Sequence, residues 1–308
     1  MNSSVQLPPS ISDFTPKQLG EVQELQHRNL TSITWPLFTT NHALFLIGLY
    51  LMSRICERII KYLQPDVSLL HLKNCTTYLL EIFWTFVALA LQLSVYRLLI
   101  RDFNYHDYET AQYMALILVD LYIFELLYRP VMRLPLIMHH CITIFLVIFG
   151  TYIIQECDNL DILPLAIIIL FQATTEQITF VGLFLYRVKP SLSSRTLFFA
   201  AVQVFILKFS TLVWSYVFWE QHVLPNRDGQ SLVKAFNVIF PICGIILFGT
   251  QIWSTYVVYK IAIKARRNSK DQKHTNNNPD EKKLEENSNI TLQDINVNDA
   301  SIRVTATS

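Results

Sequence analysis

Charged residues are scarce in this chain of 308 residues, and their distribution is uneven. Only 16% of the residues are charged, whereas 52% are hydrophobic, a composition that soluble domains rarely show. Few charges fall between residues 35 and 262, and the stretch that follows is dense with them, so the net charge of +1 hides two very different regions. Scarce charge together with long apolar runs argues against a soluble protein and indicates one that lies in a lipid bilayer.

Several other signals are missing as well. The five cysteines are scattered, with no spacing typical of a metal site or of a disulfide framework, so we expect no metal. No internal repeat is visible. The first 34 residues lack the apolar core of a cleaved signal peptide, so we expect the first apolar run to act as an uncleaved anchor.

Seven apolar stretches are long enough to cross the hydrocarbon core, which takes about 20 residues. The sequence therefore predicts an all-α, polytopic membrane protein with about seven transmembrane helices. The predicted spans are 35–54, 76–100, 110–128, 134–154, 162–186, 196–219 and 233–259.

The distribution of Lys and Arg predicts the orientation of these spans, because basic residues concentrate in cytosolic loops. Alternate connections are rich in them, and the intervening connections carry few. This pattern predicts a luminal N-terminus and a cytosolic C-terminus, on opposite sides as an odd number of spans requires. The basic residues assigned to the cytosol are Arg54, Arg58, Lys61, Lys73, Arg129, Arg133, Arg187, Lys189, Arg195, Lys260, Lys264, Arg266 and Arg267.

The chain divides into four predicted regions. Residues 1–34 form a luminal segment, and 35–68 hold an extra transmembrane helix with a cytosolic loop. Residues 69–265 form a six-helix membrane domain. Residues 266–308, rich in Asn and mixed charges, cannot bury enough apolar surface to fold and are predicted to be a disordered cytosolic tail.

Ionisable side chains inside the predicted spans are the candidate functional residues, because they are costly in a bilayer and usually face a cavity or a partner. At a rise of about 1.5 Å per residue, the two adjacent histidines lie roughly 9–11 Å from the cytosolic side. Four consecutive spans place polar groups in this same half of the membrane, which predicts a polar pocket. The candidate binding residues are Asp120, His139, His140, Gln172, Glu176 and Lys208.

Two interpretations of the histidines remain open. His139 and His140 are about 100° apart on a helix, so one can face a cavity while the other contacts a neighbouring helix. A carboxylate such as Asp120 or Glu176 could orient an imidazole for general acid–base catalysis. The alternative is structural, because interhelical hydrogen bonds of these side chains also hold transmembrane bundles together. Lys208 could pair with Glu176, or snorkel toward the interface if its helix is tilted. Glu125 is expected to pair with the arginines that follow it, and Glu81 is expected to lie at the membrane interface.

The histidine pair and the segment before it resemble the TLC-domain family, which includes ceramide synthases and translocating-chain-associated membrane proteins. The matching residues are Asp120-Leu121, Glu125-Leu126-Leu127-Tyr128-Arg129-Pro130 and Leu136-Ile137-Met138-His139-His140. The polar fifth span, ending in Leu185-Tyr186-Arg187, is similar to fungal-type members. The resemblance covers roughly residues 70–265 and implies an endoplasmic reticulum membrane protein with six helices around a lipid-accessible cavity.

The resemblance implies two functions. In ceramide synthases the paired histidines belong to an acyl-CoA-dependent active site, and a His-Asp pair follows on the next span. Here the corresponding region is Leu165–Leu170 or Gln172-Ala173, and neither supplies His-Asp. We therefore expect a lipid-homeostasis protein that binds, senses or distributes a lipid without amide-forming chemistry. The alternative is an N-acyltransferase with His139 or His140 as catalytic base.

The two functions imply different ligands. A membrane lipid or acyl chain is the expected partner, and acyl-CoA would be a co-substrate only of the acyltransferase. No other cofactor and no nucleic acid are expected, and a homo-oligomer stays open. A seven-span receptor has the expected number of spans, but the seventh lacks an Asn-Pro-x-x-Tyr arrangement.

Overall fold

The structure, a computed structural model, describes residues 35–157, 160–225 and 231–277, and those residues contain helices and no strand. The long helices of the first half are α2 (Trp35–Leu63), α3 (Leu69–Ser94), α4 (Tyr105–Tyr128) and α5 (Leu134–Cys157). The second half contains α6 (Ile162–Thr174), α7 (Gln177–Val188), α8 (Pro190–Phe218) and α9 (Ser231–Asn277). A short 3₁₀-helix, η2 (Tyr96–Ile100), precedes α4, and the π-helical turn η3 (Trp219–Val223) follows α8.

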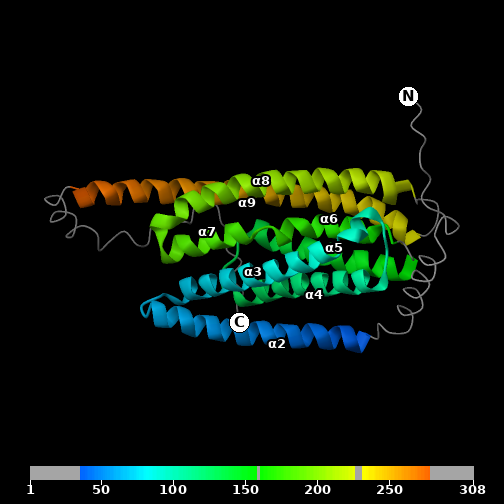
Figure 1. Cartoon of the computed structure of the whole chain (residues 1–308), viewed down its shortest axis with the longest axis horizontal. Helices are drawn as coiled ribbons and strands as arrows, with labels where there is room; N and C mark the ends of the chain where they lie inside the picture. The colour runs from blue at the N-terminus through cyan, green and yellow to red at the C-terminus, as the bar shows by residue number, and fades with distance from the viewer. Residues whose placement is uncertain (1–34, 158–159, 226–230, 278–308) are drawn as a thin grey trace, which may run out of the picture.

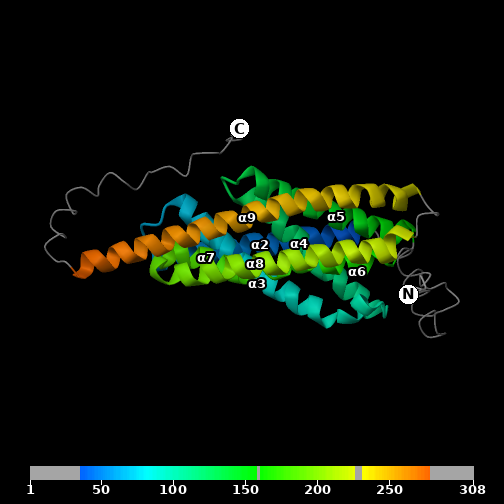
Figure 2. The same cartoon turned by 90° about the horizontal axis from the view of Figure 1, so that it is seen from above.

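The helices form an elongated bundle with their axes roughly along its length (Figure 1). Helix α2 lies along one edge, and α8 and α9 lie together along the opposite edge. Helix α3 packs against α2, α4 and α7, and α5 packs against α9. The α2–α3 and α7–α8 connections lie at the end of the bundle beyond which α9 projects, so their basic residues gather toward that end (Figures 1 and 2).

The all-α, polytopic architecture predicted from the sequence is confirmed. Six helical stretches are long and apolar enough to cross a membrane: Leu69–Ser94, His106–Tyr128, Leu134–Ile154, Ile162–Val188, Leu192–Val223 and Ser231–Arg267. Helix α2, the first of the seven predicted spans, is not among them. Its apolar run is bounded by polar Asn41 and His42 on one side and by charged Arg54 and Glu57 on the other. Six of the seven predicted spans are therefore long and apolar enough to cross a membrane, and α2 packs beside them.

Apolar side chains cover the outside of the bundle as well as its core. A contiguous apolar surface of this kind is rare on soluble monomers and is typical of helices that face lipid tails. Large exposed side chains line the outer face of α8 at helical spacing. They are Phe198, Phe199, Val202, Phe205, Ile206, Phe209, Val213 and Trp214.

Local chemistry explains where several helices start. The side chain of Asn104 accepts a hydrogen bond of 2.8 Å from the backbone N–H of Asp107 and caps α4. Ser68 caps α3 in the same way by accepting from the N–H of His71. Pro190 occupies the first turn of α8, where its missing N–H has no intrahelical partner to lose. These short-range signals set the lengths of the helices that carry the polar residues.

The predicted fifth span is broken in its middle. Helix α6 ends at Thr174 and α7 begins at Gln177, and Thr175 and Glu176 leave the helical conformation between them. The freed carbonyl oxygens find new donors, because Gln177 donates to the oxygen of Thr174 and Gln203 donates to that of Thr175. Non-helical backbone at membrane depth is tolerated only where protein satisfies it in this way. The polar run 171–179 is the sequence signal of this break.

Helix α9 is the longest helix and corrects one predicted boundary. The sequence predicts disorder from residue 266, whereas the helix continues to Asn277. Figures 1 and 2 show this end of α9 projecting past the other helices. The predicted luminal segment 1–34 and the rest of the predicted tail, 278–308, lie outside the described residues.

Candidate functional site

Buried polar side chains meet at one level of the bundle, and Glu125 on α4 holds the first group of them together. Its carboxylate forms an ion pair with Arg129 one turn later, as the sequence predicts, and its other oxygen lies 2.9 Å from Nε2 of His140 on α5. The distance between Glu125 and His140 is that of an ion pair, but their geometry does not make a hydrogen bond, and Nε2 has no other hydrogen-bond partner. Nε of Arg129 donates to the side-chain oxygen of Asn74 on α3 at 3.1 Å.

Tyr122, one turn before Glu125 on α4, lies beside both histidines. Its ring centroid is 4.2 Å from that of His140 and 5.9 Å from that of His139. The buried phenol of Tyr122 lies near three carboxyl groups, those of Glu81, Glu125 and Glu176. Tyr122 therefore connects the α4–α5 part of the site to the break between α6 and α7.

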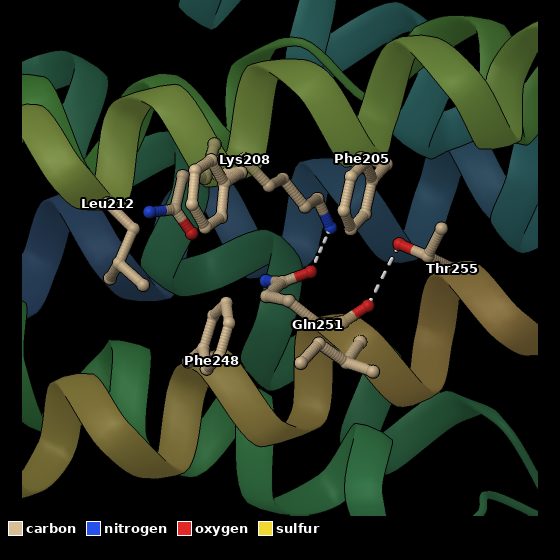
Figure 3. A pocket seen from close by; sticks show the side chains of 9 residues that line it. Phe205, Lys208, Leu212, Phe248, Gln251 and Thr255 are labelled. Atoms are coloured by element: carbon tan, nitrogen blue, oxygen red, sulfur yellow. Dashed lines mark hydrogen bonds between the residues drawn. The ribbon is translucent and has the colours of Figure 1, made fainter.

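A second group of polar residues runs from His139 to that break. Nδ1 of His139 lies 3.1 Å from Nε2 of Gln251 on α9, so the amide donates to the imidazole. The oxygen of the same amide accepts a hydrogen bond from the ammonium group of Lys208 on α8. Lys208 also forms an ion pair with Glu176, which confirms the predicted pairing. Figure 3 shows Lys208 reaching from α8 toward Gln251 on α9.

A small groove opens beside Lys208 and Gln251, between α8 and α9 (Figure 3). Its walls are mostly aromatic and aliphatic, and several of them, such as Phe205, Phe209 and Ile252, are exposed on the outside of the bundle. The cavity measures about 20 Å³, room for roughly one water molecule. The groove therefore has a polar floor, formed by Lys208 and Gln251, beneath an apolar rim that faces the lipid side of the bundle. Its lining residues are Gln172, Phe205, Lys208, Phe209, Leu212, Phe248, Gln251, Ile252 and Thr255.

Asp120 lies apart from both groups. Its carboxylate is fully buried and is paired with Nδ1 of His42 on α2 at 2.5 Å. The hypothesis that Asp120 orients His139 or His140 is therefore wrong. One and a half turns separate Asp120 from Glu125 on α4, so the two carboxylates point to different neighbouring helices. Asp120 attaches α2 to the bundle.

Five of the six predicted binding residues lie around this site. His139, Glu176 and Lys208 belong to one chain of contacts through Gln251, Gln172 lines the groove, and His140 pairs with Glu125. The residues that sequence reasoning missed are Gln251 and Tyr122, and Glu81, expected at the membrane interface, is instead fully buried. Their signal is weak because single polar residues in apolar spans, such as Gln251 in α9, do not reveal which helix they face.

The arrangement suits proton transfer and polar recognition more than metal binding. Within the described ranges, no cluster of three or more His, Cys, Asp or Glu side chains could hold a metal ion. Each imidazole has a different partner, a carboxylate for His140 and a neutral amide for His139. The two histidines therefore have chemically distinct surroundings.

Comparison with known proteins adds no family assignment. No family model matches the chain, and searches of curated proteins and of solved structures also find no match.

Proposed function

We propose that this chain is a multi-pass membrane protein of lipid homeostasis, related to the TLC-domain family, that binds, senses or distributes a lipid. The observation that carries this proposal is the groove between α8 and α9. Its rim faces outward with the lipid-exposed side chains of α8, and its floor presents the polar ends of Lys208 and Gln251. Such a combination of apolar walls with a few convergent polar groups is typical of ligand sites.

The small size of the cavity defines how a lipid would bind. An enclosed space of about 20 Å³ cannot hold an acyl chain. We propose that the chain lies along the open rim, against Phe205, Phe209 and Ile252, while a hydroxyl or carbonyl group of the lipid reaches the amide of Gln251. The ammonium group of Lys208 already has Glu176 as its counter-ion, so the groove favours an uncharged polar group over an anion.

The experiment is to purify the full chain in mild detergent and to identify co-purified lipids by mass spectrometry. A Leu212→Trp variant fills the groove and should lose the lipid that wild type retains. The matched control is Leu93→Trp, which adds the same bulk at an exposed position on the outside of α3. Equal lipid content in wild type and Leu212→Trp would contradict the proposal.

A second candidate function is acyl-CoA-dependent N-acylation, favoured by the position of His139 next to the groove floor. In this reaction an imidazole takes the proton of a long-chain amine as its nitrogen attacks the thioester carbonyl. The C–N bond forms, the C–S bond breaks, and the thiol leaves with a proton. Acyl transfer to a sphingoid base by the purified chain, lost in a His139→Ala/His140→Ala variant, would establish the enzyme and overturn the binding protein.

We further propose an endoplasmic reticulum location with a luminal N-terminus and a cytosolic C-terminus. The proposal is supported by the basic residues at the end of the bundle where the α2–α3 and α7–α8 connections lie. The sequence offers a direct test, because Asn29-Leu30-Thr31 and Asn289-Ile290-Thr291 are both glycosylation sequons. Glycan on Asn29 alone supports this orientation, and glycan on Asn289 contradicts it.

A further inference from the structure

The carboxyl group of Glu81 on α3 accepts no hydrogen bond from any residue that the structure describes. The side chain is fully buried, and neither carboxylate oxygen has a hydrogen-bond partner among the described residues. A buried ionised carboxylate without a partner is so costly that such groups normally become neutral instead. Glu81 is therefore unlike Glu125 and Glu176, each of which faces a cationic side chain.

The side chain of Glu81 meets another carboxyl group, that of Glu125 on α4. The side chains of Glu81 and Glu125 lie within hydrogen-bonding reach of each other across α3 and α4. Both groups are acceptors when ionised, so this contact is a hydrogen bond only if one of them carries a proton. Two ionised carboxylates at this separation would repel strongly in a low-dielectric interior.

The surrounding charges determine which carboxyl group holds the proton. Glu125 forms an ion pair with Arg129 and lies 2.9 Å from His140, so Glu125 is the ionised member. Glu176 at the α6–α7 break adds a further negative charge near Glu81, and it is neutralised by Lys208. With Glu81 protonated, the charges of Arg129, Lys208, Glu125 and Glu176 cancel.

The cation near Glu81 is Arg129, and its guanidinium is already paired with Glu125. The titratable groups of α2 that turn inward are engaged elsewhere, His42 with Asp120 and Glu57 with Arg54 and Tyr128. Nε2 of His140 faces the carboxylate of Glu125 at 2.9 Å. In the neutral tautomer that carries its hydrogen on Nδ1, Nε2 can accept a proton that Glu125 passes on. Glu81, Glu125 and His140 therefore form a chain along which one proton has two positions, at either end.

We propose that Glu81 and Glu125 form a proton-binding site inside the bundle, with His140 as the second resting position of the proton. The ligand is a single proton, taken from water at the end of the bundle where Arg129 and Asn74 lie. When the proton sits on Glu81, the carboxylic O–H donates to Glu125. When it sits on His140, the imidazolium pairs with Glu125 and Glu81 becomes an anion facing the α6–α7 break. This site is separate from the lipid groove, and neither proposal depends on the other.

Infrared difference spectroscopy of the full chain in nanodiscs tests the site directly. Wild type at neutral pH should show the C=O stretching band of a buried carboxylic acid, shifted on transfer to D₂O and lost as the pH is raised. The band should be absent from Glu81→Gln and retained in the control Glu220→Gln, which alters an exposed carboxylate on η3. A band retained in Glu81→Gln, or no band in wild type, would overturn the proposal.

Thermal unfolding provides a second readout that does not require the band. Glutamine matches the shape and neutrality of a protonated glutamate, so Glu81→Gln should unfold at or above the wild-type temperature at neutral pH. A lower unfolding temperature, or failure to fold, would mean that Glu81 is ionised and would overturn the site. Loss of the wild-type band on addition of Na⁺ at constant pH would also overturn it, because the ligand would then be a metal cation.

Discussion

The ammonium group of Lys208 on α8 pairs with the carboxylate of Glu176 at the point where α6 and α7 separate. Both residues lie among apolar helices, and the side chain of Lys208 is only 6% exposed. The pair therefore ties the broken helix to α8. The same ammonium group holds Gln251, so one side chain joins α8, α9 and the break.

Removing Lys208 should destabilise the protein more than removing the pair. Lys208→Met leaves Glu176 without its counter-ion, which we expect to cost about 3 kcal/mol, since losing one partner of a buried pair is strongly unfavourable. The double variant Lys208→Met/Glu176→Gln removes both charges and should recover most of this loss. Thermal unfolding in detergent measures the loss of stability in the single and in the double variant. Equal losses in the single and double variants would show that the ion pair is not the cause.

Helices α7 and α8 approach closely at Gly182, and a methyl group there should weaken their contact. A Cβ added to Gly182 would lie 2.8 Å from Cδ2 of the buried Leu197, so the leucine must move. Gly182→Ala should cost about 1 kcal/mol, in the range measured for overpacked cores. Gly249→Ala is the matched control, because nothing lies within 4 Å of the added atom. A control that loses as much stability as Gly182→Ala would rule out the close approach as the cause.

Arg101 joins three connections at the end of the bundle opposite the basic loops. Its guanidinium lies 2.7 Å from Asp161 before α6 and 3.4 Å from Nδ1 of His222 in η3. Arg101→Ala should cost about 1–2 kcal/mol, because it removes a charge-assisted hydrogen bond. The control is Arg97→Ala, an exposed arginine of the same connection. Hydrogen–deuterium exchange at η2 and η3 should increase in Arg101→Ala alone.

Helix α2 should depend on His42 for its position. His42→Leu leaves the fully buried Asp120 without its partner, at an expected cost of about 2–3 kcal/mol. A disulfide-trapping experiment between cysteines introduced on α2 and α4 would report the docking, and its yield should fall in His42→Leu. Leu44→Ala, at an exposed position of α2, should leave the yield unchanged.

The helices of this bundle could be predicted from the sequence because apolar runs of about 20 residues have few alternatives in a membrane protein. The start of α5 and the start of α6 follow directly from Arg133, Pro135 and the polar residues before Ile162, whereas α5 runs to Cys157, three residues past its predicted end. The break at Thr175 and Glu176 could not be located to the residue. Its position depends on donors from other helices, such as Gln203 on α8, and no local pattern reveals them.

The site was predictable in its residue types but not in its pairings. His139, His140, Glu176 and Lys208 stand out because charge is rare in the spans. Which carboxylate meets which histidine depends on how α4 is rotated about its axis, and a helix rich in apolar residues on every side gives little indication of that rotation. Asp120 therefore looked like the partner of a histidine on α5, and the structure pairs it with a histidine on α2.

The Glu176–Lys208 contact also bears on how the chain enters the bilayer during synthesis. Helices α6 and α7 are made before α8, so the acidic residue reaches the translocation channel while its basic counterpart is still being added. A charge at the centre of a lone helix costs about 2.5–3.5 kcal/mol on insertion. Insertion has the lowest free-energy cost if the hairpin of α7 and α8 leaves the channel as a unit, with Glu176 and Lys208 already paired.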